Sequence, residues 1–208
     1  DAWKGVTGCD ITEGYGLSET APVAAFNQAG NEQYGTVGLP VDGTDIAILA
    51  EDGSHQPDGE AGEIAVRGPQ VMAGYWQRPE ATAEVMTADG YFKTGDVGVI
   101  LPNGCIQIVD RLKDMIIVSG FNVYPNEIED VLTQHPAILE AAVIGKPDDH
   151  SGERVCAYVS LNSEIDTADI EAHCRKLLTA YKVPKEIHVM EELPKSSVGK
   201  LLRRMLRD

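Results

Sequence analysis

The chain has 208 residues, of which 43% are hydrophobic and 24% charged, and its formal net charge is −16. This composition is typical of a folded globular protein and excludes a largely disordered chain. Acidic residues outnumber basic ones 33 to 17, which argues against a nucleic-acid partner, because phosphate binding requires clustered Lys and Arg. The longest apolar runs, such as residues 138–145, are much shorter than the ~20 residues of a membrane-spanning helix.

The charge is unevenly distributed along the chain. Residues 1–110 contain 17 acidic and 4 basic side chains, whereas residues 111–208 contain 16 and 13. A solvated acidic face on the first part explains the charge itself, and the asymmetry favours two units with different surfaces. We place the boundary between them in the charged segment 110–114, which separates two apolar runs.

The four cysteines are widely spaced and form neither a Cys-x-x-Cys motif nor a zinc-ligand pattern. Without a disulfide framework, such thiols are typical of a reduced, cytoplasmic protein in which most of them are buried as small hydrophobic residues. The residues concerned are Cys9, Cys105, Cys156 and Cys174.

Residues 1–110 predict a small, mostly antiparallel β unit with one short helix that begins near Pro79, where Pro and an acidic residue suit a helix start. Pro102-Asn103-Gly104 separates two apolar runs and indicates a hairpin, because Asn-Gly tolerates the positive φ of a tight turn. The predicted strands cover residues 45–50, 62–67, 97–101 and 105–109.

Residues 111–208 predict an α+β unit of ordinary domain size. Ile128, Val131 and Leu132 recur with helical spacing in the first predicted helix. The predicted helices cover residues 125–134, 166–181 and 201–206, and the predicted strands cover residues 139–144, 155–161 and 187–190.

Two motifs in the first unit have both a functional and a plain structural interpretation. Residues 14–20 put an aromatic ring, a hydroxyl and a carboxylate on a turn. These groups suit a nucleotide base and Mg²⁺, but for this segment by itself a plain turn is the preferred interpretation. The segment is not a dinucleotide loop, because Glu19 replaces the third glycine. In residues 90–96, Asp96 could accept both hydroxyls of a ribose or could form an Asx-type turn.

Two further motifs belong to the second unit. Residues 119–129 combine a glycine bend with a helix start, which allows a ligand to approach the backbone closely. Residues 194–200 form a loop of small residues that ends in Gly-Lys but lacks the first glycine of a P-loop, and a solvated loop is the alternative interpretation.

In this order and spacing, the motifs resemble the adenylate-forming superfamily of acyl-CoA synthetases, adenylation domains and luciferases. The resemblance covers essentially the whole chain, and residues 68–79 and 119–129 most resemble bacterial long-chain fatty-acid–CoA ligases. Residues 89–113 are similar to the signature that this family uses in fatty-acid binding and catalysis. The resemblance implies an acid–thiol ligase that uses ATP and Mg²⁺ to form an acyl-adenylate from a fatty acid and then a thioester with CoA.

The resemblance also implies roles for individual residues of the first unit. Tyr15 would stack on adenine, and Ser18, where Thr is commoner, would contact phosphate. The implied nucleotide-binding set is Tyr15, Gly16, Ser18, Asp96 and Arg111, with the ribose held by the last two, and the implied Mg²⁺ ligand is Glu19.

In the second unit, the resemblance implies that Lys113 is a hinge and that Gly120 and Asn122 contact CoA. Lys200 would be the catalytic residue, bridging the carboxylate and the α-phosphate during adenylation. Ile117 stands where some relatives have a lysine near the nucleotide, so that contact is not expected here.

The implied fold is α+β: residues 1–110 form the C-terminal part of the adenylating N-terminal domain, with a β-barrel portion, and residues 111–208 form a mobile C-terminal lid domain. A Ser/Thr/Gly-rich phosphate loop ending in Lys is expected well before Tyr15 and is absent from the sequence. We therefore expect the C-terminal portion of a ligase more than twice as long, inactive by itself.

Two alternatives to this function are a ligase for another acid, medium-chain or aryl, and a non-catalytic module that binds CoA or a carrier protein. The expected location is the cytoplasm. Peripheral contact with the inner face of the membrane and homo-oligomerisation are retained as hypotheses.

Overall fold

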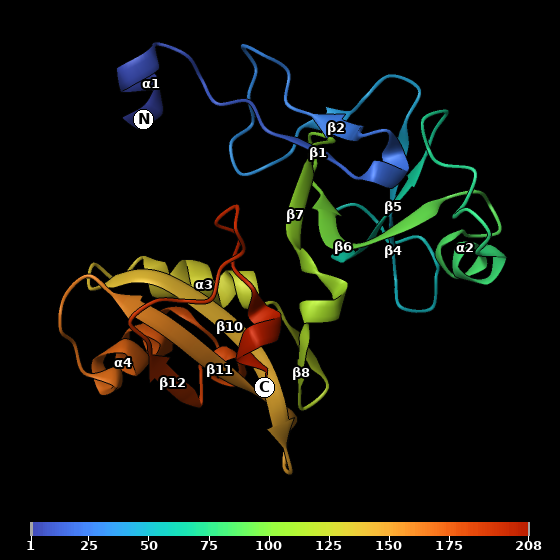
Figure 1. The fold of residues 1–208 in the computed structure, drawn as a ribbon. Coiled ribbons are helices and arrows are strands. Elements are labelled where there is room, and N and C mark those ends of the chain that lie inside the picture. The colour runs from blue at the N-terminus through green and yellow to red at the C-terminus, as the bar shows by residue number, and fades with distance from the viewer. Residues whose placement is uncertain (1, 208) are drawn as a thin grey trace. The chain divides into compact units, whose positions relative to one another are not determined.

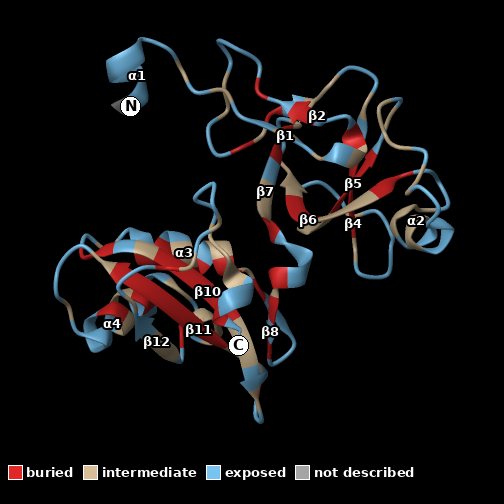
Figure 2. Ribbon diagram, in the orientation of Figure 1, coloured by how far each residue is buried: buried red, intermediate tan, exposed pale blue. Residues whose placement is uncertain are grey.

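The computed structural model describes residues 2–207 and divides into two units, Asp1–Leu112 and Lys113–Asp208 (Figure 1). The division lies two residues beyond the boundary that the sequence analysis places after Asp110. Both units combine helices with sheets, which confirms the predicted α+β class. Buried residues gather along the strands in each unit, so each has a hydrophobic core of its own (Figure 2).

The first unit consists mainly of short antiparallel strands. Its described elements are α1 (Ala2–Thr7), β1 (Gly14–Gly16), the 3₁₀ turn η1 (Ser18–Thr20), β2 (Val23–Phe26), β3 (Leu39–Pro40), β4 (Asp45–Leu49), β5 (Gly62–Arg67), α2 (Pro79–Val85), β6 (Phe92–Ile100) and β7 (Ile106–Arg111).

These strands form a three-stranded sheet, β1-β2-β3, and a four-stranded sheet, β4-β5-β6-β7. Ile106 of β7 joins the sheets, because its carbonyl accepts from Val37 N and its amide donates to Gly38 O, both at 2.8 Å. One core unites them, with Ala24 and Ala25 of β2 packed among isoleucines and valines of the larger sheet. The larger sheet ends at β4 and β7, which do not pair, so the expected β-barrel portion is an open pair of sheets over the described residues.

The second unit is built on one mixed sheet with strand order β10-β11-β8-β9, to which β12 is added parallel to β11. Its described elements are β8 (Ile116–Val118), β9 (Phe121–Val123), α3 (Pro125–Thr133), β10 (Ile138–Asp148), β11 (Gly152–Leu161), α4 (Thr167–Leu177), β12 (Glu186–Val189) and the 3₁₀ turns η3 (Ala180–Lys182) and η4 (Arg203–Leu206); η2 (Leu112–Asp114) spans the division between the units.

Strand β11 buries both of its faces. Val155, Ala157 and Val159 pack into the core beneath α3 and α4. The alternate residues Cys156 and Tyr158 pack on the other side against Leu193 and Leu206 of the C-terminal segment. Because successive side chains of a strand point to opposite faces, the apolar run 155–159 is explained by a sheet covered on both sides.

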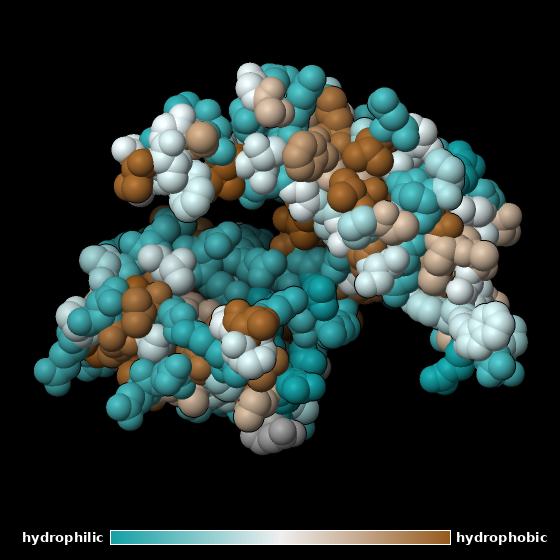
Figure 3. All heavy atoms as spheres, turned by 45° about the horizontal axis from the view of Figure 1, so that its top comes forward, coloured by the Kyte–Doolittle hydropathy of each residue, from teal (hydrophilic) through white to brown (hydrophobic). Residues whose placement is uncertain are grey.

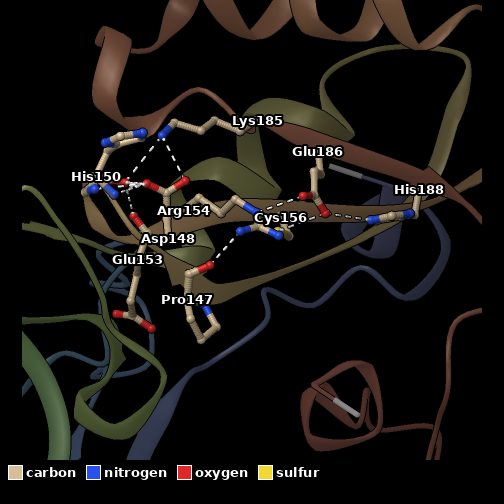
Figure 4. A network of polar contacts seen from close by, with 10 residues as sticks. Pro147, Asp148, His150, Glu153, Arg154, Cys156, Lys185, Glu186 and His188 are labelled. Carbon is tan, nitrogen blue, oxygen red and sulfur yellow. Dashed lines mark hydrogen bonds and ion pairs between the residues drawn. The ribbon is translucent and has the colours of Figure 1, made fainter.

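A network of polar contacts joins the β10–β11 turn to β12 (Figure 4). Asp148 accepts from the Ser151 hydroxyl at 2.8 Å, and the contacts with Ser151 keep the pKa of this carboxyl below its usual range. Arg154 donates to Glu186 at 2.7 Å, which ties the turn to β12. These side chains hold the turn closed, and nothing in their arrangement points to a ligand.

Three of the four cysteines are buried, and Cys9 is exposed; all four are free. Burial raises the pKa of Cys174 to about 11. Hydrophobic side chains also reach the surface among hydrophilic ones (Figure 3), and Trp76 is 87% exposed. Within residues 2–207, no helix has the length and apolar character needed to cross a membrane.

Most predicted elements are present, with three informative differences. The predicted helix 201–206 is instead the short 3₁₀ turn η4, Arg203–Leu206. Strand β6 begins at Phe92 rather than at residue 97, so Asp96 lies within a strand and not in an Asx-type turn. The predicted helix 166–181 ends at Leu177, where the chain turns toward the separate 3₁₀ turn at Ala180–Lys182.

The separate cores predict that damage to one unit stays local. Leu132→Ala removes a side chain that is fully buried beneath the second sheet, so we expect a loss of about 2–5 kcal/mol in the stability of that unit. Hydrogen exchange should accelerate in residues of the second unit and stay unchanged in β4–β7. Leu139→Ala, at a leucine that is 57% exposed, is the matched control and should have little effect. Equal acceleration in both units would contradict the description of two cores.

Candidate active site

The first unit brings together three of the predicted nucleotide-binding side chains. The Tyr15 hydroxyl donates to Asp96 Oδ2 at 2.7 Å, and Arg111 Nε lies 3.4 Å from Asp96 Oδ1. The pairing of β6 with β7 explains the second contact, because Asp96 and Arg111 are direct partners in the register. The Asp96 side chain is 11% exposed and that of Arg111 is 49% exposed, so the pair lies at the edge of the core with one side open.

The backbone around Asp96 is held by its neighbours. Gly95 has a φ of +74°, which favours glycine, and its amide donates to Glu63 Oε1 at 3.0 Å. Thr94 Oγ1 donates to Ile64 O and accepts from the Asp96 amide at 3.1 Å. The carboxylate is therefore fixed before any ligand arrives.

Tyr15 is half-buried on β1, and its burial raises the pKa of the phenol well above the usual value. The hydrogen bond to Asp96 acts in the same direction, because ionised Tyr15 would face a carboxylate. The phenol is therefore a permanent donor to Asp96 at neutral pH.

Gly16 ends β1, and the turn that follows carries Ser18 and Glu19. A Cβ at Gly16 would lie 1.6 Å from Pro22 O, so only glycine fits there. Buried Thr20 closes the turn through its hydroxyl, which accepts from Leu17 N at 2.9 Å. Ser18 is exposed at the beginning of the 3₁₀ turn, where its hydroxyl is available to a ligand.

Glu19 is partly fixed by the segment that precedes α2. Its Oε1 accepts from the Tyr75 hydroxyl at 3.0 Å, and its backbone carbonyl accepts from Met72 N at 2.8 Å. Over residues 2–207, no group of three Asp, Glu, His or Cys side chains is arranged to hold a metal ion. A single carboxylate nevertheless fits Mg²⁺ in a nucleotide site, because this ion is commonly held by one or two carboxylates together with substrate phosphates.

In the second unit, Gly120 and Asn122 belong to the hairpin of β8 and β9. Ser119 and Gly120 form its tip with φ values of 51° and +83°, a conformation that suits glycine at Gly120 and is uncommon at Ser119. Asn122 is exposed and pairs with Ile117, while Phe121 stacks on Tyr181 with a centroid distance of 4.8 Å. The hairpin thus presents backbone and an amide side chain beside an aromatic pair.

Lys113 and Lys200 are both exposed lysines of the second unit, on different elements. Lys113 lies in η2, at the point where the units divide. Lys200 lies in a tight turn closed by two hydrogen bonds with Ser196, from Ser196 N to Lys200 O at 2.8 Å and from Lys200 N to Ser196 Oγ at 3.1 Å. Among the described residues, no hydrogen bond or ion pair joins Lys200 to the β8–β9 hairpin.

Sequence reasoning missed the partners that orient these residues. Tyr75, which donates to Glu19, lies 56 positions away in a segment noted only for its family resemblance. Arg203, which pairs with Glu129 across 74 positions, lies in the predicted terminal helix 201–206, and no role follows for it from the sequence. No local pattern identifies such pairs, although an acidic residue between apolar positions of a helix is a signal for a buried partner.

Comparison with known proteins identifies the protein family to which the chain belongs. Residues 1–76 match the AMP-binding enzyme family, and residues 127–200 match the AMP-binding enzyme C-terminal domain. The chain therefore belongs to this family of adenylate-forming enzymes.

Among curated relatives, the chain is 51% identical over 208 residues to the long-chain-fatty-acid–CoA ligase of Haemophilus influenzae, covering 99% of this chain and 37% of the relative. Among solved structures, it is similar to ATP-bound MatB from Rhodopseudomonas palustris, with a TM-score of 0.93, 37% identity, and coverage of 99% of this chain and 41% of that one. It is also similar to o-succinylbenzoate CoA synthetase (MenE) from Bacillus subtilis in complex with the acyl-adenylate OSB-AMP, with a TM-score of 0.88, 34% identity, and coverage of 100% and 43%.

The geometry of Tyr15 predicts a pH-dependent contribution to stability. At neutral pH, Tyr15→Phe removes a hydrogen bond to a carboxylate and should lower the free energy of unfolding by about 1.5–3 kcal/mol. The folded-state pKa of Tyr15 is raised, so above about pH 10 the unfolded chain loses this proton first. The difference between the two proteins should then shrink by about 1.4 kcal/mol per pH unit. Urea unfolding from pH 8 to 11 measures it, and a constant difference would contradict the buried phenol.

Proposed function

We propose that this chain supplies the ribose-binding strands and the lysine-bearing C-terminal unit of an ATP-dependent long-chain fatty-acid–CoA ligase. The observation that carries the proposal is the similarity to such ligases along the entire chain. The chain spans 37% of the length of these relatives, so the activity proposed is that of the full-length protein. Its substrates would be a fatty acid, ATP and CoA.

In the first unit, Asp96 would accept the ribose hydroxyls of ATP. Its two oxygens already accept from Tyr15 and lie near Arg111, and an ionised carboxylate offers about four acceptor sites, so capacity remains for the sugar. Arg111 would add a second contact from its open side, and the ring of Tyr15 would stack on adenine. The pre-formed hydrogen bonds around Asp96 support this role, since a fixed acceptor loses little entropy on binding.

Glu19 and Ser18 would face the phosphates from the turn after β1. When bound, Mg²⁺ would offset negative charge on the phosphates as the carboxylate of the fatty acid attacks the α-phosphorus. The hydrogen bond from Tyr75 leaves Glu19 Oε2 without a described partner and so available to that ion.

The second unit would act in both half-reactions. Lys200 would bridge the substrate carboxylate and the α-phosphate, because a compact ammonium on a long stem can reach between two anionic oxygens. Lys113 would be the pivot about which the unit turns, and Gly120 and Asn122 would then admit and contact CoA. A pivot at an exposed, polar element boundary fits the general character of hinges.

The identity of the carboxylic acid substrate is the part of the proposal for which there is a specific alternative. The structural relative MenE is named for a different acid, o-succinylbenzoate, so this architecture alone does not select a fatty acid. The test is pyrophosphate release by the full-length protein with acids of graded chain length. A preference for long chains supports the proposal, a preference for short or aryl acids supports the alternative ligase, and no release with any acid supports a non-catalytic module.

Asp96→Asn tests the ribose contact. Asparagine keeps an acceptor for Tyr15 and removes the charge, so the melting temperature should stay within a few degrees of wild type. Affinity for ATP should fall by about one to two decades, because a hydrogen bond to a charged group contributes about 1.5–3 kcal/mol. Calorimetric titration of the full-length protein measures the affinity. A lower melting temperature with unchanged affinity would leave Asp96 as a purely structural residue.

Lys200→Ala tests the catalytic assignment. The ammonium acts where charge develops in the transition state, so acyl-AMP formation should slow by about 10²–10³-fold. The unit is expected to turn Lys200 away during the second half-reaction, so conversion of supplied acyl-AMP and CoA to thioester should be unaffected. Rapid-quench measurement of each step distinguishes the two. Equal damage to both steps would overturn the assignment.

A further inference from the structure

The C-terminal segment is anchored by a compact set of charged side chains that the proposed reaction does not use. Arg203 makes a bidentate contact with Glu129, in which Nε donates to Oε1 at 3.0 Å and Nη2 donates to Oε2 at 2.7 Å. Its Nη2 also donates to Asn126 Oδ1 at 2.7 Å. The side chains of Arg203 and Glu129 are 20% and 17% exposed, so the pair is largely withdrawn from solvent, where a bidentate contact is stronger than at the surface.

Glu129 connects three elements at once. Its Oε1 accepts from the Val143 amide at 2.7 Å while it also accepts from Arg203. Helix α3, strand β10 and the turn η4 therefore meet at one carboxylate. Since both oxygens are engaged, the position of Arg203 relative to the sheet is fixed.

Asp114 extends this set toward the division between the units. It follows Lys113 directly, is 8% exposed, and accepts from Arg207 at 2.7 Å. Arg203 Nη1 lies 3.7 Å from its other oxygen. The residue next to the proposed pivot is thus tied to the same short segment as Glu129. We call Asp114, Glu129, Arg203 and Arg207 the C-terminal clamp.

The two arginines of the clamp follow Lys200 closely in the chain. Arg203 is three residues after Lys200, and Leu206, 5% exposed, packs into the apolar cluster on the same side of β11. The residues before Lys200 are also held. Pro194 O accepts from the Leu202 amide at 2.8 Å, and Lys195 forms an antiparallel β-bridge with Leu201. The backbone that carries Lys200 is therefore tethered at both ends, although its side chain is exposed.

We infer that the C-terminal clamp is a positioning device, which sets where the Lys200 ammonium stands relative to the pivot and so supports adenylation. The inference rests on the proposed function of Lys200. Its two arginines and two carboxylates balance in charge, and loss of one partner leaves another charge partly buried and unpaired. Displacement of a catalytic group by about 1 Å from a change outside the chemistry can cost on the order of 10² in rate.

Arg203→Lys in the full-length protein is the first test. Lysine keeps the charge but cannot reproduce the bidentate contact. We expect acyl-AMP formation to slow by about ten- to hundred-fold at saturating ATP, with the KM for ATP unchanged. Thioester formation from supplied acyl-AMP should match wild type. Arg204→Lys, at the exposed neighbouring arginine, is the matched control and should leave both steps unchanged.

The second test repeats the change in a Lys200→Ala background. If the clamp acts through Lys200, Arg203→Lys should cause no further loss of acyl-AMP formation there. Glu129→Gln, which keeps an acceptor for Val143, gives an independent variant if Arg203→Lys folds poorly. Equal loss in both half-reactions, or a further loss without Lys200, would overturn the clamp. Wild-type protein that forms no acyl-AMP would instead refute the proposed function itself.

Discussion

Burial of both faces of β11 is the constraint on which the second unit depends. One face packs beneath the helices and the other meets the C-terminal segment, while the strand also pairs with β8 at Gly152 and with β12 over residues 156–159. The hairpin proposed to contact CoA and the segment that carries Lys200 are therefore both attached to one strand. A change in the apolar run of β11 would therefore disturb both.

Each unit contains a carboxylate paired with an arginine, but the two pairs differ in how far apart their residues lie in the sequence. Asp96 and Arg111 are neighbours across two adjacent strands, so sheet register alone brings them together. Glu129 and Arg203 are joined across 74 positions and meet only after the sheet, a helix and the C-terminal segment have assembled. The first pair therefore depends only on the pairing of β6 with β7, whereas the second depends on the assembly of the whole unit.

Helices and strands long enough to show a sequence pattern could be predicted. Very short strands, and contacts between residues far apart in the sequence, could not. The apolar runs of β4 and β5, the Asn-Gly turn before β7 and the helical spacing in α3 all have a direct local cause. Strands β1–β3, β8 and β9 contain two to four residues each, which is too few to show a period. Thr94 and Gly95 look like turn residues, but the residues on both sides of them pair with β5 and β7, so both lie within β6. Resemblance predicted Tyr15, Asp96 and Arg111 as site residues, but their orienting partners come from tertiary packing.

The tight turn that closes on Lys200 has a consequence for proteolysis of the chain. Val198 at its tip is 86% exposed, and Leu193 before the turn and Leu206 after it are buried in the same apolar cluster. Exposed loop tips of small residues are the preferred sites of proteolytic nicking. A single cut at residues 197–199 would leave both cores and both flanking anchors in place. Proteolysis at this tip would thus yield a nicked protein that keeps its folded cores while the loop geometry around Lys200 is lost.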